Sequence, residues 1–334
     1  MKKSLLALAV LGAFAGAASA QSSVTLYGKV DLGVGKATGS ADKQVRDGAS
    51  SRVGIKGVED LGGGMKALFG FEHRFSPDTG MDTTTEGKTP TSTFWNGYST
   101  VGLGGTFGTV NLGRQYTSAF TLAQDVFDPF GSYTVAGLRG VALTPKTKVL
   151  VDNVQTPTDA AKLRTANSIR YDGTFGGVSV AADIAERSTS AASGAKRPYS
   201  VAAQYALGPV LAAVSYENPE GAKDNLLTAG VAYTFGPAKL AAALSSGKDA
   251  DGDKLRGYLL GATVKVGTAG RVLAGYASLK EDSGTTSATA KKVSLGYRHD
   301  LSERTFLYTD VTRVNKVITA TEQTGYDFGV QHNF

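Results

Sequence analysis

Apolar and polar side chains alternate with a period of two along much of this chain. Between residues 24 and 34, the even positions hold Val, Leu and Gly, and the odd positions hold Thr, Tyr, Lys, Asp and Gly. The alternation returns in residues 65–75 and 292–298, where Lys, Arg and Glu share the parity opposite to the apolar side chains. A period of two is typical of a β-strand with one apolar and one polar face. These segments predict an all-β protein.

Short and long polar connections separate the predicted strands in turn. Tight turns rich in Gly, Pro and Asp lie at residues 59–64, 104–108, 174–177, 208–209, 236–237, 267–270 and 301–303. Longer polar stretches lie at residues 36–49, 76–93, 116–163, 188–197, 218–224, 247–254, 281–290 and 316–322. This alternation predicts about sixteen antiparallel strands of roughly ten residues, the up-and-down plan of a transmembrane β-barrel. The polar faces would then line a lumen, and closure would leave no sheet edge in lipid.

The first twenty residues read as an export signal. Two lysines precede an apolar run over residues 5–18, which ends in the small-x-small cleavage site ASA. The run is too short for a transmembrane helix, which needs about 20 apolar residues. We expect residues 1–20 to be a signal peptide that is removed on export, and residues 21–334 to form the barrel.

The composition is compatible with a transmembrane barrel and excludes other classes of protein. The mean hydropathy of −0.10 and the hydrophobic content of 41% look like those of a soluble protein. A barrel gives the same averages, because lipid-facing and lumen-facing residues cancel. The chain has no cysteine, which excludes disulfides and thiolate metal sites. Its net charge of +6 is dispersed along the chain, unlike the basic patch of a nucleic-acid-binding protein.

Several short segments in a fixed order carry a family likeness. They are SVTLYG at 23–28, SRVGIKG at 51–57, EDLGGGMKA at 59–67, VGL at 101–103, FGTVNLGRQY at 107–116, NSIRY at 167–171 and the terminal Phe334. In these segments the chain resembles the trimeric general porins of Gram-negative bacteria, in particular the β-proteobacterial type. The resemblance implies an outer-membrane homotrimer whose partners are outer-membrane lipids, including lipopolysaccharide, and small polar solutes and ions.

The resemblance also implies a particular pore. In this family the third and longest external loop folds inward, and its acidic groups face a ladder of Arg and Lys on the opposite wall. The longest loop here covers residues 116–163, and its segment 125–131 is similar to the inward-folded tip. The ladder positions match Lys29, Arg52 and Arg164.

The parity of the charged residues points the same way. Lys29 and Arg52 sit on polar strand faces, and antiparallel pairing across the turn at Leu61 would bring Glu72 near Arg52. Opposed charges across a narrow pore create a transverse field that contributes to selectivity. We therefore expect a constriction with a basic wall of Lys29, Arg52, Arg164 and Arg170, the last sharing a face with Arg164, and an acidic side of Asp125, Asp128 and Glu72. The alternative, that these are ordinary solvated strand charges, stays open here.

Two positions depart from the family pattern. Where the family usually places another ladder arginine, this chain has Asn96 and Gly97, which predicts a wider or less cationic constriction there. Arg114 shares parity with Val110 and Leu112, so it should point outward, where a charge facing lipid costs about 2–4 kcal/mol at the midplane. We therefore expect Arg114 at a subunit interface, paired with Glu86 of a neighbour.

Charge along the long loop predicts the selectivity. The loop is formally neutral, because its acidic and basic residues are equal in number. They are Asp125, Asp128, Asp152 and Asp159 against Arg139, Lys146, Lys148 and Lys162. With the basic wall added, the lumen leans positive. The sequence thus predicts a mild preference for anions.

No pattern in the sequence indicates catalysis, a metal or a cofactor. The three histidines are far apart, and neither a P-loop nor a Gly-x-Ser-x-Gly elbow occurs. Residues 249–253 resemble a calcium loop but lack its order and its distal Glu, so we expect at most a loose divalent cation there. The rival interpretations are a substrate-specific channel, a barrel-based adhesin or enzyme, and a secreted β-sandwich.

Overall fold

The fold is a single closed β-barrel, seen in a computed structural model that describes residues 22–82, 94–131, 134–147, 158–187, 194–285, 287–315 and 323–334. The signal peptide expected at residues 1–20 lies outside the described residues. Within the described ranges, sixteen long strands run antiparallel to their neighbours. No helix of these ranges is long and apolar enough to cross a membrane. The sixteen-stranded barrel predicted from alternation is confirmed, and the β-sandwich is excluded.

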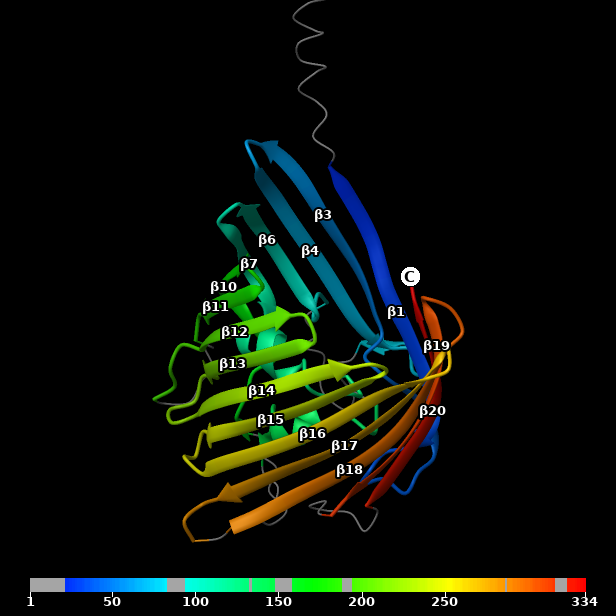
Figure 1. Ribbon diagram of the computed structural model, residues 1–334. Coiled ribbons are helices and arrows are strands. Elements are labelled where there is room, and N and C mark those ends of the chain that lie inside the picture. Colours follow the sequence, from blue (N-terminus) through cyan, green and yellow to red (C-terminus); the bar gives the residue numbers. More distant parts are fainter. Residues whose placement is uncertain are drawn as a thin grey trace, which may run out of the picture.

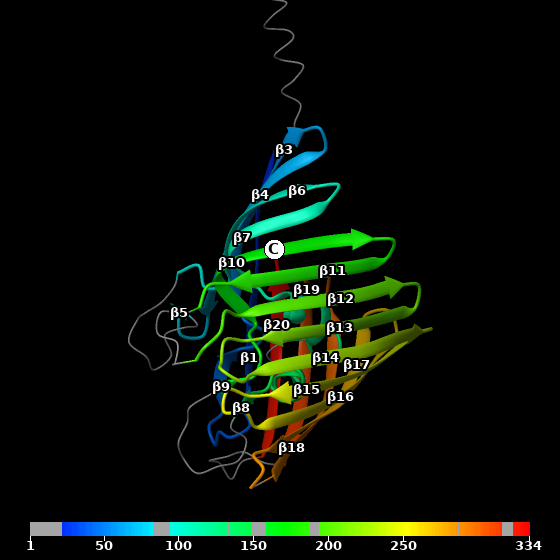
Figure 2. The same ribbon diagram turned by 90° about the vertical axis from the view of Figure 1, so that its left-hand side faces the viewer.

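The long strands follow one another around the barrel in chain order (Figure 1). They are β1 (Ser23–Lys36), β3 (Arg52–Gly62), β4 (Met65–Ser76), β6 (Tyr98–Gly105), β7 (Gly108–Tyr116), β10 (Arg164–Phe175), β11 (Val178–Ala185), β12 (Tyr199–Leu207), β13 (Val210–Asn218), β14 (Asn225–Phe235), β15 (Ala238–Lys248), β16 (Lys254–Val266), β17 (Gly270–Asp282), β18 (Ser287–Asp300), β19 (Thr305–Val314) and β20 (Thr324–Asn333). The short strands β2 (Gln44–Asp47), β5 (Met81–Asp82), β8 (Lys146–Thr147) and β9 (Thr158–Asp159) lie in the longer connections. Figure 2 shows β10 to β16 side by side along one wall.

The barrel closes where the last strand meets the first. β20 pairs antiparallel with β1, from Lys29 opposite Asn333 to Lys36 opposite Tyr326. Gly28 and Phe334 exchange two backbone hydrogen bonds of 3.0 Å. A Cβ on Gly28 would lie 2.4 Å from the Phe334 ring, so only glycine fits against it. The C-terminal residue thus takes part in closing the barrel.

Apolar side chains cover the outside of the barrel. Val24 is 71% exposed, and Val101, Leu260 and Val293 are each more than half exposed. Polar side chains such as Ser200 and Thr228 are instead buried on the inner face. This is the reverse of a soluble protein and is typical of a barrel whose outer surface faces lipid.

The connection between β7 and β10 is here called loop 3 (residues 117–163), and its described residues, 117–131, 134–147 and 158–163, pack inside the barrel. It contains the π-helical turn η1 (Phe120–Gln124), which contacts β11 to β14, and the short helix α2 (Arg139–Ala142), which contacts β16 to β18. Loop residues pack on small wall residues in one apolar cluster, formed by Ala123, Phe127, Leu138, Ala142 and Leu143 with Ala213, Ala232, Ala243, Leu259 and Ala277. Burying each large apolar side chain contributes about 1.5–3 kcal/mol. The loop is thus held against one wall.

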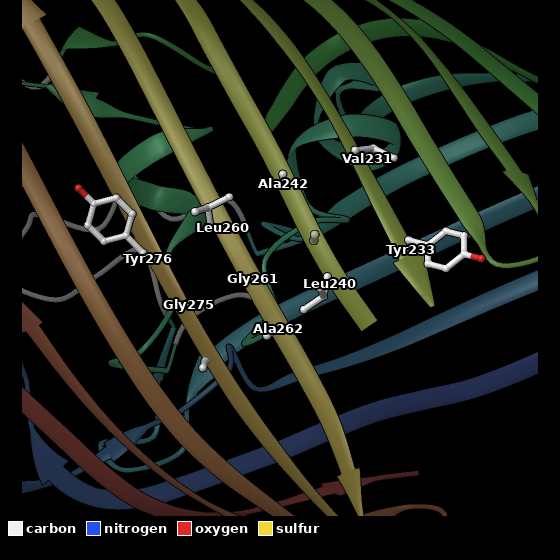
Figure 3. Close-up of a pocket in the computed structure, with 11 residues that line it drawn as sticks. Val231, Tyr233, Leu240, Ala242, Leu260, Gly261, Ala262, Gly275 and Tyr276 are labelled. Carbon is white, nitrogen blue, oxygen red and sulfur yellow. The ribbon is translucent and has the colours of Figure 1, made fainter. Parts of the chain in front are cut away.

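Small wall residues also hollow the outer face of the same strands. A shallow apolar depression of about 540 Å³ crosses β14 to β17, with Ala242 and Ala262 at its base and Val231, Leu240 and Leu260 around it (Figure 3). The side chains of Leu240, Ala242 and Leu260 alternate along their strands with those of Ala243 and Leu259, which contact loop 3. The depression therefore faces away from the lumen and is separate from the site described below.

Candidate functional site

Loop 3 is fastened to the wall by polar groups as well as by apolar contacts. Asp183 accepts a hydrogen bond of 2.5 Å from the Ser118 amide, and Asp327 accepts one of 3.1 Å from the Val135 amide. These buried carboxylates satisfy backbone groups that would otherwise lose their water partners. The two arms of the loop are thereby fixed across the lumen.

Basic and acidic side chains meet on the wall formed by β1, β3 and β4. Lys29 stands opposite Arg52 in the strand register. Glu72 Oε2 lies 3.7 Å from Arg52 Nη1, and Glu72 Oε1 lies 2.9 Å from Arg74 Nε. The approach of Glu72 to Arg52 is the one that antiparallel pairing predicts. Tyr27 also donates to Glu72 Oε2 at 3.2 Å, so this carboxylate is held from three sides.

A group of arginines surrounds two aromatic rings where loop 3 leaves the wall. Tyr116 and Phe120 stack with ring centroids 4.8 Å apart. Arg74 and Arg164 both donate to the Tyr116 hydroxyl, and the Arg164 guanidinium lies 3.9 Å from the ring centroid. Arg139, from α2, lies 4.7 Å from the Phe120 ring. Guanidiniums stack well on aromatic faces, so the rings hold like charges close together.

Arg170, on β10, contacts the beginning of loop 3. Its Nη1 donates to the Tyr116 carbonyl at 2.9 Å, and its Nη2 donates to Thr121 Oγ1 at 2.7 Å. Parity predicted a face shared with Arg164, and both side chains reach Tyr116, Arg164 at the hydroxyl and Arg170 at the carbonyl. A β-bulge between Thr165 and Ser168 shifts the register, so alternation is interrupted between the two arginines.

The two loop aspartates have different surroundings. Asp125 forms an ion pair with Arg139 and is 39% exposed. Asp128 is 7% exposed, and its oxygens accept the amides of Phe130, Leu138 and Arg139 at 3.0, 2.6 and 2.7 Å. Burial raises the pKa of Asp128 to about 6, although these amides lower it. Asp128 thus joins the two arms of the loop tip from within.

A cavity of about 410 Å³ separates the loop tip from the wall formed by β1 and β16 to β20. Its charged lining residues are Lys29, Asp31, Asp125, Arg271, Arg298 and Asp310. Lys29 and Asp125, predicted on opposite sides of a constriction, therefore border the same space. Asp128 does not belong to its lining.

Asn96 and Gly97 occupy the place where the family pattern has an arginine. Asn96 Oδ1 accepts the Arg74 amide at 2.7 Å, and its Nδ2 donates to the Arg74 carbonyl at 3.0 Å. A Cβ on Gly97 would lie 2.5 Å from Glu72 Oε1. The neighbouring strand supplies a guanidinium here through Arg74. Its parity with Glu72 was the sequence signal that could have singled it out.

Arg114 lies on the outer side of β7, as its parity predicted. Leu112, on the same face, is 48% exposed. Arg114 Nε donates to the Asn96 carbonyl at 3.1 Å, which leaves the side chain half-buried under the segment before β6. Its expected partner, Glu86, lies outside the described residues, so the intersubunit pair stays a prediction.

Comparisons with known proteins agree with this architecture. The chain matches the family described as Gram-negative porin over residues 7–318. It is 33% identical to outer membrane porin protein 32 of Delftia acidovorans and 27% identical to an outer membrane porin protein of Bordetella pertussis, each over all of both chains. The solved anion-selective porin from Comamonas acidovorans has a TM-score of 0.77 at 29% identity, over 94% of this chain and 100% of the other. A trimer form of OmpT from Vibrio cholerae shares the fold at a TM-score of 0.69 and 12% identity, over 94% of this chain and 99% of the other.

Proposed function

The chain belongs to the Gram-negative porin family and forms a diffusion channel in the outer membrane, and we propose that its selectivity is set by the charged residues described above. Small hydrophilic solutes and ions pass through the lumen, with a mild preference for anions. The relatives are named as porins, and we propose that this chain likewise catalyses no reaction and holds no cofactor.

One observation supports the preference for anions. Four basic side chains, Arg52, Arg74, Arg139 and Arg164, gather with two acidic ones, Glu72 and Asp125, beside the root of loop 3. The excess of positive charge raises the local anion concentration in a narrow, low-dielectric passage. The similar solved structure from Comamonas acidovorans is named as anion-selective.

The constriction lies between the wall and loop 3, and the wall carries an acidic group beside its basic ones. We propose Lys29, Arg52, Arg164 and Arg170 as its basic wall, joined by Arg74, and Asp125 and Glu72 as its acidic groups. Asp128 acts indirectly, because it shapes the loop tip that carries Asp125.

Planar-bilayer recording tests this function. With purified protein in a KCl gradient, we expect a reversal potential that favours chloride over potassium and a conductance that rises linearly with salt. A potential that favours potassium would contradict the anion preference. Saturable block by one sugar or one anion would instead favour the rival reading, a substrate-specific channel.

We further propose that the barrel assembles as a homotrimer in lipid that includes lipopolysaccharide, after cleavage behind Ala20. Arg114, half-buried on the outer face, is the candidate contact with Glu86 of a neighbour. We expect Arg114→Ala to lower the temperature at which the oligomer dissociates in detergent, measured by native electrophoresis. An unchanged dissociation temperature would contradict a role for Arg114 at the interface. The intact mass of the exported protein tests the cleavage after Ala20.

A further inference from the structure

Three carboxylates from different parts of the chain meet at one end of the barrel. Asp249 and Asp253 belong to the connection between β15 and β16, and Glu281 lies near the end of β17. One oxygen from each of the three lies within 4.8 Å of the others. Glu281 stands opposite Leu255 in the register of β16 and β17. Strand pairing thus provides the glutamate that the sequence of the loop itself lacks.

Asp249 has one oxygen that its own loop does not use. Its Oδ1 accepts the amides of Asp251, Gly252 and Asp253 at 3.0, 2.9 and 2.9 Å. Its Oδ2 is buried and accepts no hydrogen bond from the described residues, and the whole residue is 0% exposed. A buried carboxylate oxygen is costly unless a donor or a cation compensates it.

The charges around this oxygen favour a cation as its partner. Asp253 and Glu281 add two negative charges at short range, which repel that of Asp249. Lys223 Nζ donates to the Asp251 main-chain carbonyl at 3.1 Å, so it is bound to the backbone of the loop.

We propose that Asp249, Asp253 and Glu281 bind one calcium ion. Calcium takes oxygen ligands at about 2.3–2.6 Å, so oxygens on opposite sides of the ion stand roughly 5 Å apart, and a spread of up to 4.8 Å fits. Calcium accepts a flexible set of oxygen ligands, whereas magnesium demands near-ideal octahedral geometry and gives up its water reluctantly. Water and main-chain carbonyls complete the shell.

Such an ion would fasten the β15–β16 connection to β17. The site lies at the end of the barrel that carries the longer loops, which in transmembrane barrels is the extracellular end. The ion therefore stabilises the outer mouth of the channel, and this role is independent of the charges at the constriction.

Calorimetric titration with calcium chloride tests the proposal. Full-length barrel is refolded in detergent, so that no lipopolysaccharide contributes calcium sites, and is then treated with a chelator and dialysed. We expect one calcium ion per chain, with a dissociation constant of about 10⁻⁵–10⁻³ M. Asp249→Asn keeps the oxygen that accepts the loop amides, and Glu281→Gln leaves the loop unchanged. Each should weaken binding by roughly tenfold or more.

Asp282→Asn is the matched control, since the next position on a strand points to the opposite face. It should bind calcium as the natural sequence does. Circular dichroism and heat-dependent mobility in electrophoresis confirm that each variant is folded, and Glu281→Gln decides the matter if Asp249→Asn does not fold. Absence of calcium binding up to about 10 mM, well above the range of extracellular sites, would overturn the proposal. Unaltered binding in Glu281→Gln, or equal affinity for magnesium, would overturn it as well.

Discussion

At the scale of single residues, the charge at the constriction depends on a few close contacts. Glu72 is 3% exposed and lies between Arg52 and Arg74. A carboxylate between two guanidiniums cancels part of their field. Removing it therefore changes the potential that a passing ion meets, while a side chain of equal shape keeps the packing.

Glu72→Gln is expected to strengthen the preference for anions. A unit charge near the ion path is worth about 1 kcal/mol at 4 Å in water, so the chloride-to-potassium permeability ratio should rise by roughly two- to fivefold. Reversal potentials in a KCl gradient measure this ratio. Glu59→Gln removes the same charge from an exposed position near the turn between β3 and β4 and should leave it unchanged. A shift toward potassium would show that Glu72 does not oppose the arginines.

Asp128 predicts a pH dependence of stability. Its native pKa of about 6 lies above the usual value of about 3.9, so its neutral form is favoured in the folded barrel. The stabilisation is complete below about pH 4 and is lost as pH rises through 6. Asp128→Asn does not titrate. From pH 7 to pH 4, the free energy of unfolding of the natural protein should therefore rise by about 2–3 kcal/mol relative to that of the variant.

Thermal denaturation of both proteins at the two pH values measures this difference, because the other titrating groups are common to both and cancel. If the gap between the two midpoints did not change with pH, Asp128 would not titrate in this range.

At the scale of elements, loop 3 is shaped by the wall beneath it. Phe127 and Leu138 fill space that glycines on β14 and β17 leave open. A Cβ on Gly230 would lie 2.6 Å from the Phe127 ring, and one on Gly275 would lie 2.3 Å from Leu138 Cδ1. The loop and the wall fit only because these wall positions lack side chains.

Gly275→Val should displace the loop tip without opening the barrel. The new side chain overlaps Leu138, and overpacking of this kind costs about 1–3 kcal/mol. We expect an altered single-channel conductance with an unchanged circular dichroism spectrum. Ala274→Val adds bulk on the same strand but on the outer face, and its conductance should match that of the natural protein. Equal conductance in both variants would mean that Leu138 does not fix the tip.

At the scale of the whole molecule, one seam closes the sheet. The backbone bonds between Gly28 and Phe334 and the ring of Phe334 over Gly28 complete the contact of β1 with β20. An open sheet would expose unpaired backbone groups to lipid, where each costs several kcal/mol.

Phe334→Ala is therefore expected to lower the yield of folded barrel. The fraction folded in detergent is read from heat-dependent mobility in electrophoresis. Phe235→Ala removes an equally exposed ring near the turn between β14 and β15, away from the seam, and should fold with little loss. If the two variants folded equally well, the Phe334 ring would contribute only to the apolar outer surface and not to closure of the barrel.

The sequence by itself determined the all-β class, the number of long strands and the inner position of Lys29 and Arg52, because side chains alternate strictly along a strand and each face has a single environment. Only the tertiary structure decided how loop 3 uses its charges. Asp128 turned inward to backbone amides, a bulge interrupted β10 between Arg164 and Arg170, and Arg74 filled the place beside Asn96. It also brought Glu281 to Asp249 from another strand. These contacts depend on register and on the path of a long loop, and no local periodicity encodes either.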